Sequence, residues 1–301
     1  MLKSKIVYVK ILITAVLIGY LLKAVGLRDM YDVIQGGSEI FFLCSCAFIP
    51  LFIVIKTLKW HLMTRYAGAT EGFSTSLSAI LVGLGFSIFT PMRAGEILRV
   101  TYYKSVEKVV LGGLVIVDRV IDLLTVLYMC LYFVVEQYSL LTTLILFLVI
   151  SSVFIMLFVV RKLPFISSVT VGSSKAAKLW QSIRKLESCL KVLTPMNIIR
   201  LCGISFVVWA VAMVQFYFIM NTYHEAPFKV ILAGLPIIQL SNLLPVTIGG
   251  IGVRENLSVM VMRLYDIPQE VAAMSAFTLY AIDILIPGMV GWIVFSTKKG
   301  K

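Results

Sequence analysis

Charge is what this sequence has least of, and its scarcity excludes most classes of soluble protein. Only 14% of the 301 residues are Asp, Glu, Lys or Arg, whereas 60% are hydrophobic, and the mean hydropathy is +0.99. A soluble domain of this length needs far more polar surface. Apolar runs of about 20 residues, long enough to cross a hydrocarbon core about 30 Å thick, recur along the chain. The composition therefore predicts an all-α, polytopic membrane protein.

Residues that build metal sites and catalytic triads are also scarce. The chain has two histidines, His61 and His224, and five cysteines without a Cys-x-x-Cys pair. These numbers exclude a histidine-rich metal site and disfavour a His-based triad or a disulfide framework. We therefore expect no cofactor and no bound metal. The net charge of +12 predicts contact with anionic lipid head groups rather than nucleic acid, because the basic residues flank apolar runs.

Six apolar runs are long enough to be full membrane spans, and two further hydrophobic regions are irregular. The six runs are residues 6–25, 40–58, 109–135, 140–160, 198–220 and 271–296. The irregular regions, 73–108 and 228–264, contain Pro, Gly and charged residues. We expect the first run to be an uncleaved helix rather than a signal peptide, because it lacks a clear small-residue cleavage site.

The distribution of Lys and Arg predicts which segments lie in the cytoplasm. Basic residues cluster near the N-terminus, in a loop from Lys56 through Lys59 to Arg65, in the loop 161–197 and at the C-terminus. We therefore place the protein in the cytoplasmic membrane, with both termini and the basic loop 161–197 cytoplasmic. For the spans to alternate correctly, region 73–108 must enter and leave from the cytoplasm, and region 228–264 from the exterior.

Two irregular regions that each enter and leave on one side, but on opposite sides of the membrane, predict two re-entrant or broken helical hairpins related as an inverted repeat. The chain would then be one transmembrane domain, 1–301, with repeat halves of roughly 1–138 and 139–301. Non-helical backbone at membrane depth is tolerated only where it is buried in protein or lines a wet cavity. The alternative is that each irregular region is an ordinary pair of short spanning helices joined by an interfacial loop.

Each irregular region contains a motif of the same kind. The first is Pro-Met-Arg-Ala-Gly-Glu-Ile-Leu-Arg at 91–99, and the second is Pro-Val-Thr-Ile-Gly-Gly-Ile-Gly-Val-Arg-Glu at 245–255. We expect Pro91 and Pro245 to break the incoming helix and the glycines to allow a tight turn. The amides freed at the next helix start would form an anion site. Paired interruptions of this kind are typical of a transport site at a repeat interface.

Charged residues in apolar segments are the candidates for a substrate site, because they are costly there unless paired or hydrated. We predict that substrate is bound by Arg93, Gly95, Glu96, Arg99, Gly249, Gly250, Gly252, Arg254 and Glu255. The supporting residues are Asp118, Arg119, Asp122, Asp283, Pro91 and Pro245.

Structural alternatives remain open for these charges. The charged residues of the two motifs could form ion pairs at the hairpin tips or extend to an interface. Asp118, Arg119 and Asp122 could form a salt bridge that docks their helix against the first hairpin. Asp283 could carry a proton or pair with a buried Arg.

Four aromatic residues lie near the ends of apolar runs. Tyr and Trp are enriched where a membrane meets water. We therefore interpret Trp60, Tyr102, Tyr103 and Trp292 as interfacial anchors rather than as parts of a binding site.

Three stretches resemble the transmembrane region of lysylphosphatidylglycerol synthase, a flippase-like family of integral membrane proteins that includes stand-alone members. The stretches are 91–99, the Asp-Arg-Val-Ile-Asp run at 118–122, and Leu244 through Glu255. The resemblance covers nearly the whole chain and implies translocation of a modified lipid head group. In the synthase, a cytosolic domain makes aminoacyl-phosphatidylglycerol and this region flips it. No soluble synthase domain follows Lys301, so we do not expect aminoacyl transfer, and the cargo need not be an aminoacylated lipid.

Two hypotheses of function follow. The first is a flippase that moves a phospholipid or lipid-linked head group through a midplane cavity, with Arg93, Arg99 and Arg254 on the lipid phosphate. The alternative is a membrane accessory subunit or enzyme in glycolipid or head-group transfer, with paired acids as general base or metal ligands. The lack of an Asp-x-Asp motif and of a His pair disfavours an enzyme. The expected partners are anionic or lipid-linked membrane lipids and a lipid-modifying enzyme.

Single cysteines in a background without native thiols test the predicted topology. We expect Lys104→Cys to react with a membrane-impermeant maleimide only from the cytoplasmic side, and Asp266→Cys only from outside. A cysteine at Lys175, in the basic loop, provides the cytoplasmic reference. Labelling of Lys104→Cys from the exterior would contradict the inverted-repeat topology.

Overall fold

The described part of the chain consists of helices and their connections. The computed structural model describes residues 19–20, 23, 27–88, 90–162, 192–241 and 250–299, and only the backbone at 91–93, 156–162 and 298–299. Every regular element in these ranges is a helix, which confirms the all-α class. Most of the predicted span 6–25, most of the basic loop 161–197, Pro245 and Gly249 lie outside the described residues.

Five long helical segments correspond to predicted spans. Four are single helices: α3 (Glu39–Tyr66), α5 (Lys108–Gln137), α6 (Leu140–Lys162) and α8 (Pro195–Tyr223). The fifth is α11 (Gln269–Tyr280), which continues through the π-helical turn η5 (Ala281–Leu285) into α12 (Ile286–Lys299). Among the described residues, three segments are long and apolar enough to cross a membrane: α3, α8 and Gln269–Thr297.

α3 is longer than the sequence predicts, and this changes the location of Lys59 and Trp60. The predicted span ended at residue 58, with Lys59 in a cytoplasmic loop and Trp60 at the interface. The helix instead continues to Tyr66, and both side chains are buried. The predictions that Lys59 lies in a loop and that Trp60 is an interfacial anchor are therefore wrong. The helix continues past residue 58, and the face that carries these two side chains packs against protein. Tyr103 is also buried, with its hydroxyl 2.8 Å from the Ser76 hydroxyl, and so is no interfacial anchor.

The first irregular region forms a helical hairpin whose two ends meet. α4 (Phe73–Ser87) leads into the 3₁₀ helix η1 (Pro91–Tyr102). Just before α4, the Glu71 carboxylate accepts hydrogen bonds from the backbone N–H groups of Lys104 (2.7 Å) and Ser105 (2.9 Å), which follow η1. The chain therefore leaves this region at the place where it enters.

The hydrogen bonds to Glu71 also keep its carboxylate charged. Burial acts to raise the pKa of Glu71, but the Ser105 hydroxyl and the two backbone donors outweigh burial and lower the pKa to about 2. Hydrogen bonds to a carboxylate favour its ionised form. The hydrogen bonds from Lys104 and Ser105 to the ionised Glu71 carboxylate, which join the two ends of the hairpin, are therefore fully formed at neutral pH.

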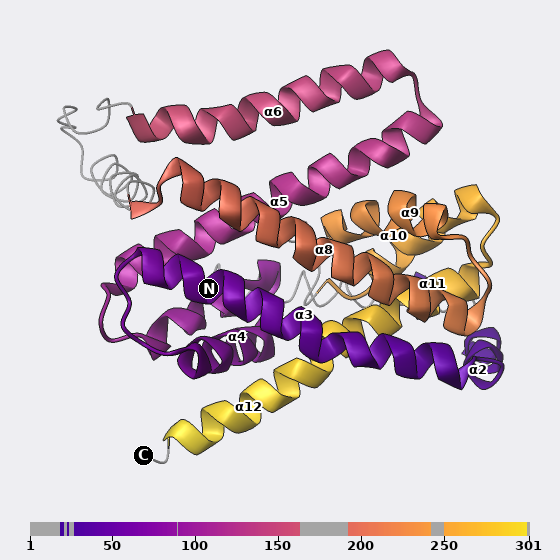
Figure 1. Cartoon of the computed structure of the whole chain (residues 1–301). Coiled ribbons are helices and arrows are strands. Elements are labelled where there is room, and N and C mark those ends of the chain that lie inside the picture. The colour runs from indigo at the N-terminus through magenta and orange to yellow at the C-terminus, as the bar shows by residue number, and fades with distance from the viewer. Residues whose placement is uncertain are drawn as a thin grey trace, which may run out of the picture.

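The second irregular region forms a hairpin at the opposite end of the helix bundle (Figure 1). It comprises α9 (Phe228–Leu240), α10 (Val253–Met262) and the short η4 (Arg263–Tyr265). The Tyr265 hydroxyl donates to Glu136, near the C-terminal end of α5 (2.8 Å). The first hairpin, in contrast, packs its outer end beside the beginning of α5, where Tyr103 and Leu111 share a hydrophobic cluster. The short helix α2 (Leu27–Gln35) lies at the same end as the second hairpin.

Two large hydrophobic clusters form the core, one beside each hairpin. The first joins α3, α4, η1 and the starts of α5 and α8, with Trp60, Leu84 and Leu114 among its members. The second joins α8, α9, α10 and α11 around Phe216 and Ile231. Each cluster ties one hairpin to helices of both halves of the chain.

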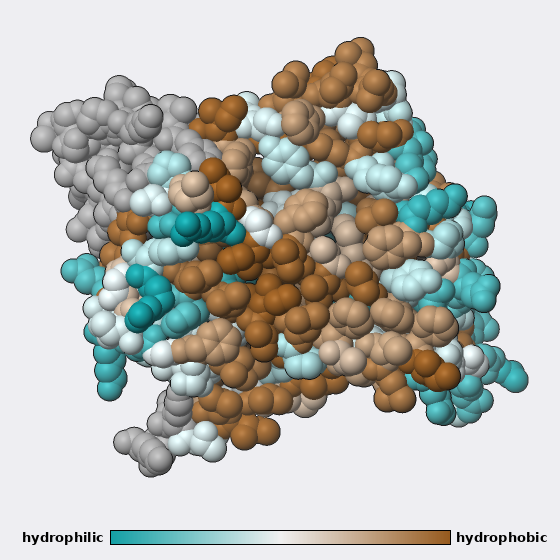
Figure 2. Space-filling model, in the orientation of Figure 1, coloured by the Kyte–Doolittle hydropathy of each residue, from teal (hydrophilic) through white to brown (hydrophobic). Residues whose placement is uncertain are grey.

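The outer surface is apolar, as expected for a protein that contacts lipid. Figure 2 shows hydrophobic residues over the middle of one face and hydrophilic residues along its right edge. α6 contributes a continuous set of exposed apolar side chains, including Leu141, Ile145 and Leu148. An exposed patch of this kind on a single helix is stable only against hydrocarbon or another apolar partner.

α4 and α12 approach so closely that only glycine fits at their contact. A Cβ at Gly291 would overlap the Leu81 carbonyl group, and a Cβ at Gly85 would lie 2.7 Å from the Gly288 carbonyl oxygen. The partners are backbone atoms, which cannot rotate away as a side chain can. Small residues that let helix backbones approach are typical of helix packing in membranes.

A pair of glycine substitutions tests this contact. We expect Gly291→Ala to lower the free energy of unfolding by about 1–3 kcal/mol, because the added methyl forces α4 and α12 apart. Gly203→Ala, in α8, is the matched control, since a Cβ there meets nothing within 4 Å. The control should be stabilised slightly, because alanine favours helix. Thermal unfolding in detergent measures both, and equal effects would contradict the close backbone contact.

Candidate functional site

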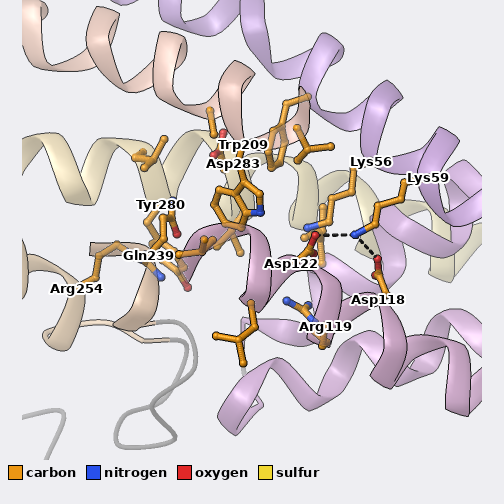
Figure 3. A pocket seen from close by; sticks show the side chains of 18 residues that line it. Lys56, Lys59, Asp118, Arg119, Asp122, Trp209, Gln239, Arg254, Tyr280 and Asp283 are labelled. Carbon is orange, nitrogen blue, oxygen red and sulfur yellow. Dashed lines mark hydrogen bonds and ion pairs between the residues drawn. The ribbon is translucent and has the colours of Figure 1, made fainter. Parts of the chain in front are cut away.

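A cavity with several charged side chains in its lining lies between the two hairpins. Its volume is about 70 Å³, which is room for several water molecules. Its walls come from both hairpins, α4 on one side and α9 and α10 on the other, and from α3, α5, α8, α11 and η5. Figure 3 labels its polar lining: Lys56, Lys59, Asp118, Arg119, Asp122, Trp209, Gln239, Arg254, Tyr280 and Asp283.

Lys59 lies between two carboxylates at one end of this cavity. Its Nζ is 2.7 Å from Asp118 Oδ1 and 2.6 Å from Asp122 Oδ1 (Figure 3). Asp118 and Asp122 are four residues apart on α5, so they share one face of that helix. The Ser205 hydroxyl of α8 donates to the same Asp122 oxygen (2.6 Å). One lysine therefore joins α3 to α5, and Asp122 extends the connection to α8.

The second oxygen of Asp118 extends the network to the first hairpin. Arg99 Nη2 donates to Asp118 Oδ2 (2.8 Å), and the Arg99 guanidinium stacks 3.8 Å above the Trp60 ring. Glu96 completes the set: it forms an ion pair with Arg119 and lies 4.0 Å from Arg99 Nη1. The ion pairs thus join three cations, Lys59, Arg99 and Arg119, to three carboxylates, Glu96, Asp118 and Asp122. The network has no net charge, which offsets the cost of burying four of its six ionised groups, Lys59, Glu96, Arg99 and Asp118.

The 3₁₀ conformation of η1 explains how Glu96 and Arg99 face the same way. A 3₁₀ helix has three residues per turn, so side chains three apart lie directly above each other. Glu96 and Arg99 are both almost fully buried on that face. This pair therefore shares one face of η1, whereas the side chain of Arg93 lies outside the described residues.

Gly95 has a different role from the predicted one. We expected it to permit a tight turn, but its φ is not positive. A Cβ at Gly95 would instead overlap the Phe86 backbone, so this glycine lets η1 lie directly against α4. Its N–H donates to the Thr90 hydroxyl (2.7 Å), so this amide is already hydrogen-bonded within the hairpin.

The second motif contains two turn glycines and a buried arginine. Gly250 and Gly252 have φ values of 80° and 85°, so both need the left-handed backbone that glycine permits. The Gly252 N–H donates to Glu255 Oε2 (2.7 Å), which caps the start of α10. The amide of Gly252, one of those predicted to bind an anion, is therefore already hydrogen-bonded within the protein. Arg254 lines the cavity, with its guanidinium 4.7 Å from the Tyr280 ring centroid.

Asp283 reaches the cavity from an irregular helical turn. It lies in η5, the π-helical turn between α11 and α12. An extra residue in a turn rotates the following side chains, and π-helical turns are frequent at functional sites. Asp283 is mostly buried and shares the cavity lining with Arg254 and Tyr280.

The predicted residues therefore fall into two groups. Arg254, Asp118, Arg119, Asp122 and Asp283 line the cavity. Glu96 and Arg99 lie behind this lining and contact it through ion pairs, whereas Glu255 forms the helix cap.

The sequence interpretation missed several lining residues, above all Lys56 and Lys59. Both were assigned to a cytoplasmic loop, although their spacing of three places them on one face of a continuing helix. That spacing is the signal that could have identified them. Trp209 and Gln239 carry no such signal, because isolated polar groups in apolar spans are common. Among the described residues, no group of His, Cys, Asp and Glu has the arrangement of a metal site.

Comparison with known proteins gives two matches over nearly the whole chain. The family model for the lysylphosphatidylglycerol synthase TM region matches residues 7–291, a range that includes both hairpins and the cavity. A UPF0104 membrane protein of Methanocaldococcus jannaschii is 24% identical over 317 aligned positions, which cover 92% of each chain. The resemblance of the three sequence stretches to this family is thereby confirmed.

The two aspartates of the network differ in what their loss should cost. We expect Asp118→Asn to lower the free energy of unfolding by about 3–5 kcal/mol, because it removes the carboxylate that Lys59 and Arg99 share and leaves Arg99 with only the 4.0 Å contact to Glu96. Asp122→Asn should cost less, since Lys59 keeps Asp118. Thermal unfolding in detergent measures both against Asp266→Asn, an exposed control. A larger loss for Asp122→Asn than for Asp118→Asn would contradict this ranking.

Proposed function

Because the chain belongs to the lysylphosphatidylglycerol synthase TM-region family, we propose that this multi-pass membrane protein moves a phospholipid or lipid-linked head group across the cytoplasmic membrane. The observation that carries the proposal is the charged cavity between the two hairpins. Charged groups inside a membrane protein mark pathways for polar substrates. The family and the apolar helices support a lipid as the substrate.

The charge of the cavity favours an anionic head group. Four cations line it, Lys56, Lys59, Arg119 and Arg254, against three carboxylates, Asp118, Asp122 and Asp283. A phosphate in a site of low polarity needs charge-assisted donors, which Lys and Arg provide. We assign the phosphate to Lys56 and Arg254, which lie on either side of the cavity in Figure 3.

This assignment refines the predicted set of phosphate contacts. Arg99 is held by Asp118 and Trp60, so we propose that it positions the network instead of touching the lipid. Glu96 positions Arg119 in the same way. Arg93, Gly249 and the amide of Gly250 stay predicted contacts of the lipid.

The placement of the hairpins suggests how each side of the membrane reaches the cavity. We propose that the α4–η1 hairpin opens toward the cytoplasm and the α9–α10 hairpin toward the exterior, as an inverted repeat of the two halves of the chain. The support is that their outer ends pack at opposite ends of α5. Small rotations of one hairpin against the other would then expose the cavity alternately. Both termini are cytoplasmic in this scheme.

Substitution of Arg254 tests the assignment. Purified protein is reconstituted into vesicles containing phosphatidylglycerol with a fluorescent nitrobenzoxadiazole head-group label, and a membrane-impermeant reductant reports the label that reaches the outer leaflet. We expect Arg254→Ala to slow translocation by roughly 10- to 100-fold, because one charge-assisted hydrogen bond contributes about 1.5–3 kcal/mol. Arg254→Lys should be intermediate, since lysine keeps the charge but loses the two-pronged contact.

Controls separate this effect from loss of folding. Arg263→Ala removes an exposed arginine a few residues along the same segment and should translocate at the wild-type rate. Thermal unfolding of each variant shows whether it remains folded. A folded Arg254→Ala variant that translocates like the wild type would remove Arg254 from the lipid path.

A further inference from the structure

We propose that translocation is coupled to protons, with Asp122 as the residue that takes up one proton for each anionic head group that enters the cavity. This inference rests on the proposed function and adds an energy source to it. It would make the protein a proton–lipid symporter, in which the pH difference across the membrane sets the direction of net movement.

The first observation is that the two aspartates of α5 are held unequally. Asp118 has a cation on each oxygen, Lys59 on Oδ1 and Arg99 on Oδ2, and its side chain is 7% exposed. Asp122 receives Lys59 and the Ser205 hydroxyl on the same oxygen, Oδ1. Its Oδ2 has no hydrogen-bond partner among the described residues, and its side chain is 19% exposed and lines the cavity. Of the two aspartates of α5, Asp122 is therefore the one with an oxygen open to water in the cavity.

The second observation is that protonation of Asp122 would leave Lys59 paired. Lys59 would keep its contact with Asp118, so no buried cation would be left without a carboxylate. An ammonium group has three N–H donors, and the two aspartates occupy two of those of Lys59. Release of Asp122 would free a second donor on the cavity side. Lys59 could then join Lys56 in binding a phosphate, since the two are three residues apart on α3 and both line the cavity.

Charge balance links the two events. The ion network is neutral before the substrate enters, with three cations against three carboxylates. A phosphate carrying one negative charge would compete with Asp122 for Lys59. A proton transferred from water to Asp122 Oδ2 neutralises the carboxylate that Lys59 has left, and the Oδ1 contact with Ser205 can remain. When the phosphate leaves on the other side, Lys59 returns to Asp122 and the proton is released there.

Several charged or titratable groups surround Asp122. They come from every element packed around the site: Lys56 and Lys59 on α3, Glu96 and Arg99 on η1, Asp118 and Arg119 on α5, Cys202 on α8, Arg254 on α10, Tyr280 on α11 and Asp283 on η5. Asp283 also lines the cavity but is not one of the six residues of the ion network. Its substitution is therefore tested beside that of Asp122.

Proton uptake on binding is the direct test. Dihexanoyl phosphatidylglycerol, a water-soluble anionic lipid, is added to purified protein in weakly buffered detergent solution with a pH indicator dye. We expect close to one proton taken up per lipid bound by the wild type, and binding that tightens by up to tenfold per unit fall in pH. Asp122→Asn should bind the lipid without taking up a proton and without this pH dependence. Asp266→Asn, an exposed substitution of the same chemistry, should behave like the wild type.

Two further variants keep the test decisive if Asp122→Asn folds poorly. Asp122→Glu retains a titratable group and should take up a proton, with its pH range shifted. Asp283→Asn should retain proton uptake, because Asp283 lies outside the ion network. Loss of uptake in Asp283→Asn together with its retention in Asp122→Glu would assign the proton to Asp283 and overturn the role of Asp122.

Vesicle experiments distinguish failure of the coupling from failure of the proposed function. Translocation of the labelled phosphatidylglycerol is measured with the pH difference imposed in either direction. We expect net movement toward the alkaline side in the wild type and equal rates in both directions for Asp122→Asn. Wild-type translocation that ignores the pH difference would overturn the coupling and leave the lipid path intact. A wild type that neither binds nor moves the lipid would overturn both.

Discussion

The position of Lys59 between two carboxylates of α5 is the constraint on which the rest of this structure depends. An ammonium group in the middle of an apolar bundle is stable only with anions beside it, and those anions need further cations of their own. The network therefore grows from Lys59 through Asp118 to Arg99 and so reaches the first hairpin. Through Asp122 it reaches Ser205 on α8. Helices that apolar packing alone would allow to slide are thereby fixed in register, and the cavity has a charged wall of fixed shape.

Much of the fold could be predicted from the sequence, because long apolar runs and paired Pro–Gly interruptions have few structural solutions in a membrane. The helix starts near residues 109 and 140 agree closely with the structure for this reason. The end of α3 could not be predicted from hydropathy, since Lys59 looks like a loop residue until its partners on α5 are known. Trp60 was misjudged with it, because a tryptophan beside basic residues has the pattern of an interfacial anchor. Its actual partner, the Arg99 guanidinium, lies 39 positions further along the chain.

Prediction of the site from the sequence is limited in the same way. The motif arginines and glutamates were identified because charge is rare in this chain, but rarity does not distinguish a group that binds substrate from one that holds another side chain. Arg99 and Arg254 occur in matching motifs, yet Arg99 donates to a carboxylate and Arg254 lines the cavity. Gly95 and Gly250 likewise look equivalent, although one accommodates a neighbouring backbone and the other adopts a left-handed turn. Contacts between distant segments make these differences, and no local pattern encodes them.

The glycine contacts on the two hairpins give the molecule a mechanical asymmetry. At the first hairpin, Gly95 of η1 and Gly291 of α12 face main-chain atoms of α4, so these three helices are in contact through backbone atoms. On the second, the space beside Gly234 is filled by the tip of Met262, a side chain that can change conformation. In the proposed cycle the first hairpin would therefore be the stiffer of the two. Its opening would work against backbone contacts and that of the second hairpin against side-chain packing, so the two steps would differ in speed.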